Sequence, residues 1–74
     1  AQRMDAGHAR WRLKSLRRHA EGLHRGVGLR IDDLLKEVIN DGERGELTFL
    51  TKTVMPPLEK LLDDLKATER ALED

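Results

Sequence analysis

Residues 6–27 read AGHARWRLKSLRRHAEGLHRGV, and their apolar side chains recur at alternating intervals of three and four residues. This spacing is typical of a helix that packs lengthwise against another helix. It predicts an apolar row along one edge of the first helix, formed by Ala6, Ala9, Leu13, Leu16, Ala20, Leu23 and Val27.

A second apolar row in the C-terminal half offers the first helix a partner. Together the two rows predict an interaction seam formed by Ala9, Leu13, Leu16, Ala20, Leu23, Leu58, Leu61 and Leu65. Residues 1–30 hold eight Lys/Arg against two Asp/Glu, a net of +6, and residues 31–74 hold six against twelve, a net of −6. Opposite charge favours pairing of the two halves, within one chain or between two.

Charged residues beside the predicted seam are expected to set the register and orientation of the paired helices, as flanking charges do in coiled coils. These orientation charges are Arg10, Arg12, Arg17, Asp64 and Glu69.

Size and composition restrict the class of protein. A chain of 74 residues forms at most one domain, and a chain this short buries only about 60% of its unfolded surface. Charged residues make up 38% of the chain and aromatic residues 3%, which favours long helices over sheet. The absence of cysteine excludes disulfides and is compatible with a cytoplasmic or other reducing compartment. We expect a soluble helical domain that is a fragment of a larger protein.

Helices are expected over about residues 5–25, 29–41, 47–54 and 57–72. The two glycines of residues 26–28 weaken a helix, and Pro56 and Pro57 are poorly tolerated in a helix interior, so these are the two predicted weak points. Asn40-Asp41-Gly42 resembles a helix stop, which predicts a turn over residues 40–45.

The fold class is predicted to be all-α. The favoured architecture is an antiparallel helical hairpin, about residues 5–40 against 47–73, bent near its middle. The alternative is a three-helix bundle of residues 5–25, 29–41 and 57–72, connected by residues 46–55. Since a two-helix hairpin alone exposes much of its apolar stripe, we expect dimerisation into a four-helix bundle or docking onto another protein.

Residues that could carry chemistry are few and poorly arranged. His19 and His24 are five residues apart, so they project about 140° apart on a helix instead of sharing a face as metal ligands would. Ser15 is the only serine and lacks the strand-turn-helix context of a hydrolase nucleophile. The sequence therefore predicts no enzyme, no metal, no cofactor and no small-molecule substrate.

Trp11 admits two interpretations. A slip of the helix register near its start would let the indole cover the end of the core. Otherwise Trp11, with Arg18 on the same outer side, is a partner anchor, because Trp and Arg are enriched at the energetic centres of interfaces.

Two functions from different classes remain open. The first is a non-catalytic protein–protein interaction module, an oligomerisation or docking domain whose partner is a second copy or a helical segment of another protein. The alternative is a basic helix that binds nucleic acid or an acidic membrane surface through its arginines.

Overall fold

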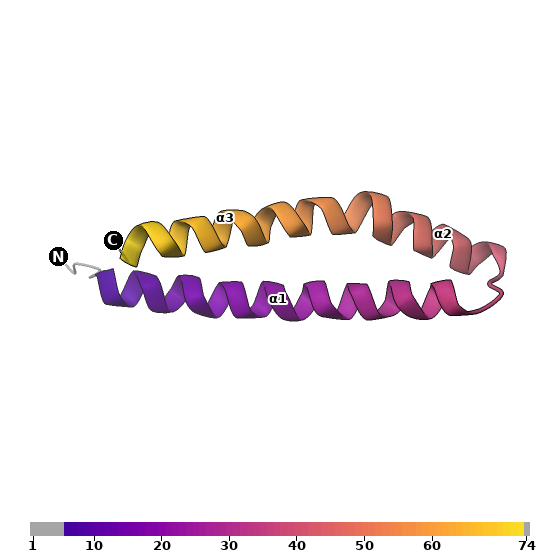
Figure 1. Ribbon diagram of the computed structural model, residues 1–74, viewed down its shortest axis with the longest axis horizontal. Coiled ribbons are helices and arrows are strands. Elements are labelled where there is room, and N and C mark those ends of the chain that lie inside the picture. The colour runs from indigo at the N-terminus through magenta and orange to yellow at the C-terminus, as the bar shows by residue number, and fades with distance from the viewer. Residues whose placement is uncertain (1–5, 74) are drawn as a thin grey trace.

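The computed structural model describes residues 6–73, and these fold into two long antiparallel helical arms. The first arm is α1, Ala6–Lys36, and the second runs through α2, Asp41–Phe49, a π-helical turn η1, Leu50–Val54, and α3, Met55–Glu73. Figure 1 shows the arms side by side, with the start of α1 and the end of α3 at one end of the hairpin and the connection at the other. The all-α class and the antiparallel arms are confirmed. The expected helix start at residue 5 lies outside the described residues.

The first arm differs from the prediction because α1 continues through residues 26–28 without a break. None of the described glycines has a positive φ, so Gly26 and Gly28 keep ordinary helical geometry. Val27, Ile31 and Leu34 all turn toward the second arm, and one unbroken helix is required to keep these three in a single row. The three-helix alternative, with its separate helices 5–25 and 29–41, is therefore wrong.

The connection between the arms also differs from the prediction. The turn spans residues 37–40, and Asn40, expected to end a helix, caps the start of the next one. The Glu43 amide donates to Asn40 Oδ1 at 2.8 Å, and the Asn40 amide donates to Glu43 Oε1 at 3.2 Å. These reciprocal bonds form a capping box, and they place Gly42 inside the first turn of α2.

The prolines are accommodated within the second arm and do not break it. They lie in the first turn of α3, directly after η1, whose wider turn is closed by the Met55 amide donating to the Leu50 carbonyl. Proline lacks an N–H and its ring collides with the carbonyl four residues earlier in a regular α-helix. The π-helical turn relieves this conflict, and Figure 1 shows the second arm changing direction where α2 passes into α3.

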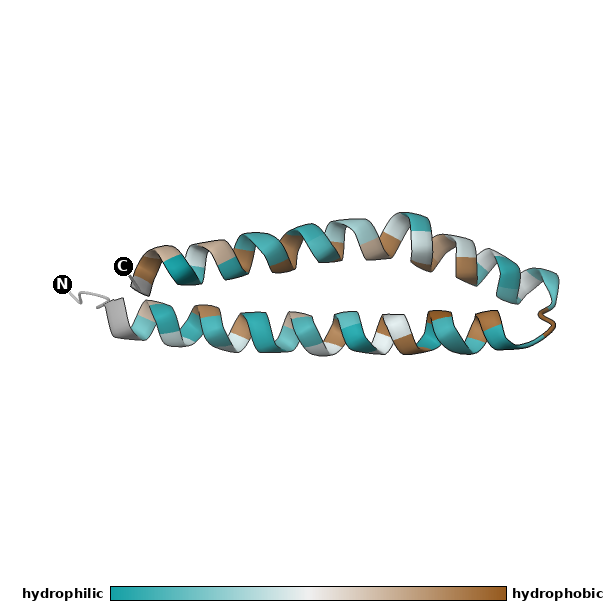
Figure 2. Ribbon diagram, in the orientation of Figure 1, coloured by the Kyte–Doolittle hydropathy of each residue, from teal (hydrophilic) through white to brown (hydrophobic). Residues whose placement is uncertain are grey.

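The π-helical turn also corrects the register of the second arm. Leu58, Leu62 and Leu65 of α3 form a row of half-buried or buried residues. If the second arm were an uninterrupted α-helix, Thr51 would lie in the same row. Thr51 is instead exposed and Leu50 is turned inward. One extra residue in η1 thus keeps Leu47 and Leu50 turned inward together with Leu58, Leu62 and Leu65. Figure 2 shows hydrophobic segments along the edges by which the two arms face each other.

Candidate interaction surface

The core between the arms is small. Ala20 of α1 packs against Leu62 and Leu65 of α3, with Leu13 partly buried at the edge of this cluster. Leu34, near the far end, is the remaining buried apolar residue of the described chain. Four buried side chains provide little hydrophobic stabilisation for a hairpin 57 Å long.

The row of α1 that faces the second arm shares Leu13, Ala20 and Val27 with the predicted one, but Arg17 and His24 take the places of Leu16 and Leu23. The inward row runs through Leu13, Arg17, Ala20, His24, Val27, Ile31 and Leu34. Of the predicted seam, Ala20 and Leu65 are buried, and Ala9, Leu13 and Leu58 are half-buried. Leu16, Leu23 and Leu61 are 50%, 54% and 44% exposed, so they are not buried between the two arms of one chain, and whether they form a seam between two chains stays a prediction.

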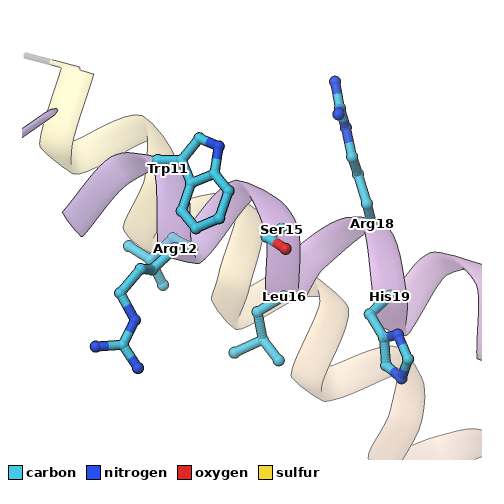
Figure 3. A pocket seen from close by; sticks show the side chains of 7 residues that line it. Trp11, Arg12, Ser15, Leu16, Arg18 and His19 are labelled. Atoms are coloured by element: carbon cyan, nitrogen blue, oxygen red, sulfur yellow. The ribbon is translucent and has the colours of Figure 1, made fainter. Parts of the chain in front are cut away.

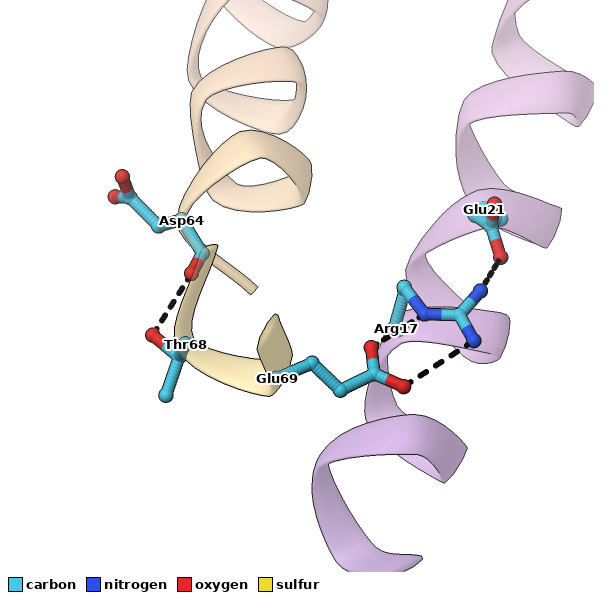
Figure 4. Close-up of polar contacts among 5 residues, drawn as sticks. All are labelled: Arg17, Glu21, Asp64, Thr68 and Glu69. Atoms are coloured by element: carbon cyan, nitrogen blue, oxygen red, sulfur yellow. Dashed lines mark hydrogen bonds and ion pairs between the residues drawn. The ribbon is translucent and has the colours of Figure 1, made fainter. Parts of the chain in front are cut away.

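Arg17 occupies the inward position that Leu16 was expected to fill, and it joins the two arms (Figure 4). Its Nε donates to Glu69 Oε2 at 2.5 Å and its Nη2 to Glu69 Oε1 at 3.3 Å, while Nη1 bonds Glu21 Oε1 at 2.6 Å. These hydrogen bonds from Arg17 lower the pKa of Glu69, against partial desolvation, and Arg17, Lys14 and Arg18 add electrostatic attraction. Arg17 and Glu69 therefore pair across the two arms, and whether they set the register of α1 against α3 stays a prediction.

A second arginine joins the arms near the connection. Arg30 donates from Nε to Glu46 Oε2 at 2.7 Å and from Nη2 to Glu46 Oε1 at 3.0 Å. The hydrogen bonds from Arg30 lower the pKa of Glu46, opposed by partial desolvation and assisted by the charge of Arg30. Sequence reasoning missed this pair because Glu46 falls between the predicted turn over residues 40–45 and the predicted helix over residues 47–54.

The other predicted orientation charges do not join the arms. Arg10, Arg12 and Asp64 are exposed, and within residues 8–72 none of their charged groups forms an ion pair. Figure 4 shows the Asp64 carboxylate pointing away from α1, while its carbonyl accepts from Thr68 Oγ1 at 2.8 Å. Only Arg17 and Glu69 of the predicted set meet each other.

The two long sides of the hairpin differ in chemistry. One side carries a shallow depression lined by charged and polar residues of both arms, including Glu21, His24, Glu59 and Lys66. Glu21, Glu59 and Lys66 each directly follow an inward residue of their helix. We call this side the polar face; on it His24 Nε2 lies 3.9 Å from Glu59 Oε2.

The opposite side carries exposed leucines together with charged and polar residues such as Arg12, His19 and Asp64. Leu16, Leu23 and Leu61 each directly precede an inward residue, so helical geometry places them about 100° from it, on the side away from the polar face. In an antiparallel pair these preceding positions of both helices lie on the same side. We call Leu16, Leu23 and Leu61 the leucine face.

Trp11 does not cover the end of the core. Its side chain is 67% exposed, and it lines a shallow depression on α1 together with Leu16, Arg18 and His19. In Figure 3 Leu16 and His19 extend to one side of α1 and Arg18 to the other. Trp11 and Arg18 are thus accessible to a partner, and whether they anchor one stays a prediction.

Among residues 6–73 no group of three or more His, Asp or Glu side chains is placed to hold a metal ion. Within the same residues, no helix has the length and apolar character required to cross a membrane. Comparison of the chain with models of protein families, with curated proteins and with solved structures finds no match.

Proposed function

We propose that this chain is a non-catalytic interaction module that covers its exposed apolar side chains by packing against another helical surface. The observation that supports this is the accessible surface, which is 5991 Å². A folded monomer of 8.5 kDa exposes about 4,700 Å², so this chain exposes about 1,300 Å² more.

The shape and the exposed residues support the same proposal. The radius of gyration is 16.8 Å, against about 11 Å for a compact domain of this length. Eight large apolar residues are exposed in the described chain, whereas only three, Leu34, Leu62 and Leu65, are buried. Burial of apolar surface is the main favourable term in association, so a partner helix would stabilise the hairpin.

Sedimentation equilibrium combined with thermal unfolding followed by circular dichroism tests this function. If the module self-associates, the midpoint of unfolding rises with concentration, because association stabilises only the folded chain. A monomer without cooperative unfolding would indicate docking onto a different protein. A monomer that unfolds cooperatively at a midpoint independent of concentration would overturn the proposal, because the hairpin would then be complete by itself.

A second candidate function is binding of nucleic acid or an acidic membrane surface. Arg10, Arg12, Arg18 and Arg25 are exposed on α1, and none of them is part of an ion pair within residues 8–72. Binding to phosphates weakens steeply as salt concentration rises, whereas apolar helix packing holds or strengthens slightly. A salt titration of binding therefore separates the two functions.

A further inference from the structure

We infer that a second copy of this chain covers the leucine face, so that two hairpins form a four-helix bundle whose two-fold axis runs parallel to the helices. This inference rests on the proposed function and specifies its partner and surface. It uses Leu16, Leu23 and Leu61, which the fold leaves half-exposed although they continue the apolar pattern of both arms.

The leucine face spans both arms. Ala20 packs against Leu62 and Leu65, and His24 lies beside Glu59, so Leu23 and Leu61 lie at about the same height along the hairpin. Leu16 lies two helical turns, about 10 Å, nearer the chain ends. A two-fold axis along the helices preserves these heights, so Leu23 and Leu61 of both copies would meet in one layer.

The area is sufficient for a stable dimer. The hairpin is 57 Å long and 19 Å wide, about 1,100 Å² in outline, whereas a standard interface buries about 800 Å² on each partner. The area of a standard interface, about 800 Å² on each partner, is also more than half of the excess accessible surface of this chain over a compact monomer of the same mass. A single symmetric interface on this side therefore removes most of the excess.

Charge decides how the second copy is oriented. α1 holds eight Lys/Arg against three Asp/Glu, a net of +5, and residues 41–73 hold five against eight, a net of −3. An axis parallel to the helices places each α1 over α3 of the other copy, whereas an axis across the hairpin places α1 over α1. The charged residues beside the leucine face agree with an axis parallel to the helices. Arg12 and His19 flank Leu16 on α1, and Asp64 lies one turn from Leu61 on α3, so this axis places basic residues of one copy over the acidic helix of the other.

The surface is tested by glutamine substitution of leucines. Leu23→Gln and Leu61→Gln should each raise the dimer dissociation constant about a hundred-fold, because each change acts twice in a symmetric dimer. Leu29→Gln is the matched control: Leu29 is 60% exposed but lies on the side of α1 opposite the second arm. It should change the constant less than about three-fold.

The orientation is tested without touching the interface. The chain has no cysteine, so Val38→Cys gives one attachment site for a spin label in the exposed connection between the arms. In the proposed dimer both connections lie at the same end, so the distance between labels is much shorter than the 57 Å length of the hairpin. A distance close to that length would overturn the orientation. This measurement holds even if the leucine variants unfold.

The outcomes separate this inference from the proposed function. A wild-type dimer that Leu23→Gln and Leu61→Gln leave intact would overturn the leucine face as the interface but keep self-association. A wild-type monomer at all accessible concentrations would overturn the second copy as partner. If that monomer binds acidic lipid vesicles through the same leucines, the face is a membrane-binding surface and the inference is also wrong.

Discussion

The half of the hairpin near the chain ends and the half near the connection are built differently, although one helix, α1, runs through both. Against α3, α1 buries a cluster of Ala20, Leu62 and Leu65 beside an Arg17–Glu69 pair whose side chains are 21% and 14% exposed. Near the connection, α2 and η1, both fully described, contain no buried residue, and the side chains of Arg30 and Glu46 are 48% and 39% exposed.

The difference shows where the stability of the hairpin resides. The half near the chain ends combines apolar packing with a partly desolvated ion pair, and the half near the connection depends on Leu34, a capping box and an exposed pair. Exposed ion pairs contribute little because water and salt screen them. We therefore expect the connection end to open first, as regions with few buried apolar contacts do.

The largest expected effect tests this difference directly. Leu65→Ala removes a side chain that is only 7% exposed and should lower the free energy of unfolding by about 2–3 kcal/mol. Leu47→Ala, at a half-buried position of α2, should cost about 1 kcal/mol. Urea denaturation followed by circular dichroism measures both, and equal losses would show that the two halves are equally well packed.

The boundary between the halves should become more stable when its glycines are replaced. A Cβ added at Gly26 or Gly28 meets no atom within 4 Å, and both residues are inside a continuous helix. Gly28→Ala should therefore raise the free energy of unfolding by about 1 kcal/mol, with Gly22→Ala, away from the boundary, as the matched control. Destabilisation by Gly28→Ala alone would mean that α1 bends at this point in solution.

The connection end depends on its helix cap. Asn40→Ala removes the side-chain oxygen that accepts from the Glu43 amide and should cost about 1 kcal/mol. Asn40→Asp keeps an acceptor and should retain most of the stability. Hydrogen exchange should show faster exchange of the α2 amides in the alanine variant and little change in α3. Equal acceleration of exchange in α2 and α3 would contradict the expectation that the connection end opens independently of the rest of the hairpin.

The smallest effect is expected from acid. The pKa values of Glu69 and Glu46 are lowered in the folded chain, chiefly by hydrogen bonds from Arg17 and Arg30. Their stabilisation is therefore complete above the unfolded glutamate pKa, about 4.3, and is lost as pH falls through the lowered values. Arg17→Gln should reduce this loss more than Arg30→Gln, because the Arg17 pair is less exposed. Thermal unfolding at pH 7 and pH 3 measures the difference.

Particular residues show how far sequence reasoning reached. Leu13, Ala20 and Leu65 were predicted from heptad spacing to lie in a helical seam and do lie between the arms. The same spacing also predicted Leu16, Leu23 and Leu61, which the structure leaves exposed. Arg17 and Glu69 were predicted as flanking charges and are found paired across the arms. Asn40 was misinterpreted because Asn-Asp-Gly fits a helix stop as well as a cap; Glu43, three residues later, was the signal for the cap.

The sequence by itself determined that the chain is helical, that the arms carry apolar rows and that their charges are opposite, because these properties are local and periodic. Only the tertiary structure decided which row of α1 turns inward. Leu13 and Ala20 belong to two possible rows, one completed by Leu16 and Leu23 and the other by Arg17 and His24. Leu34 belongs to both rows, whereas Ile31 belongs only to the second and Arg30 to the first. Because α1 is unbroken, the register that turns Ile31 inward leaves Leu16 and Leu23 on the outer face.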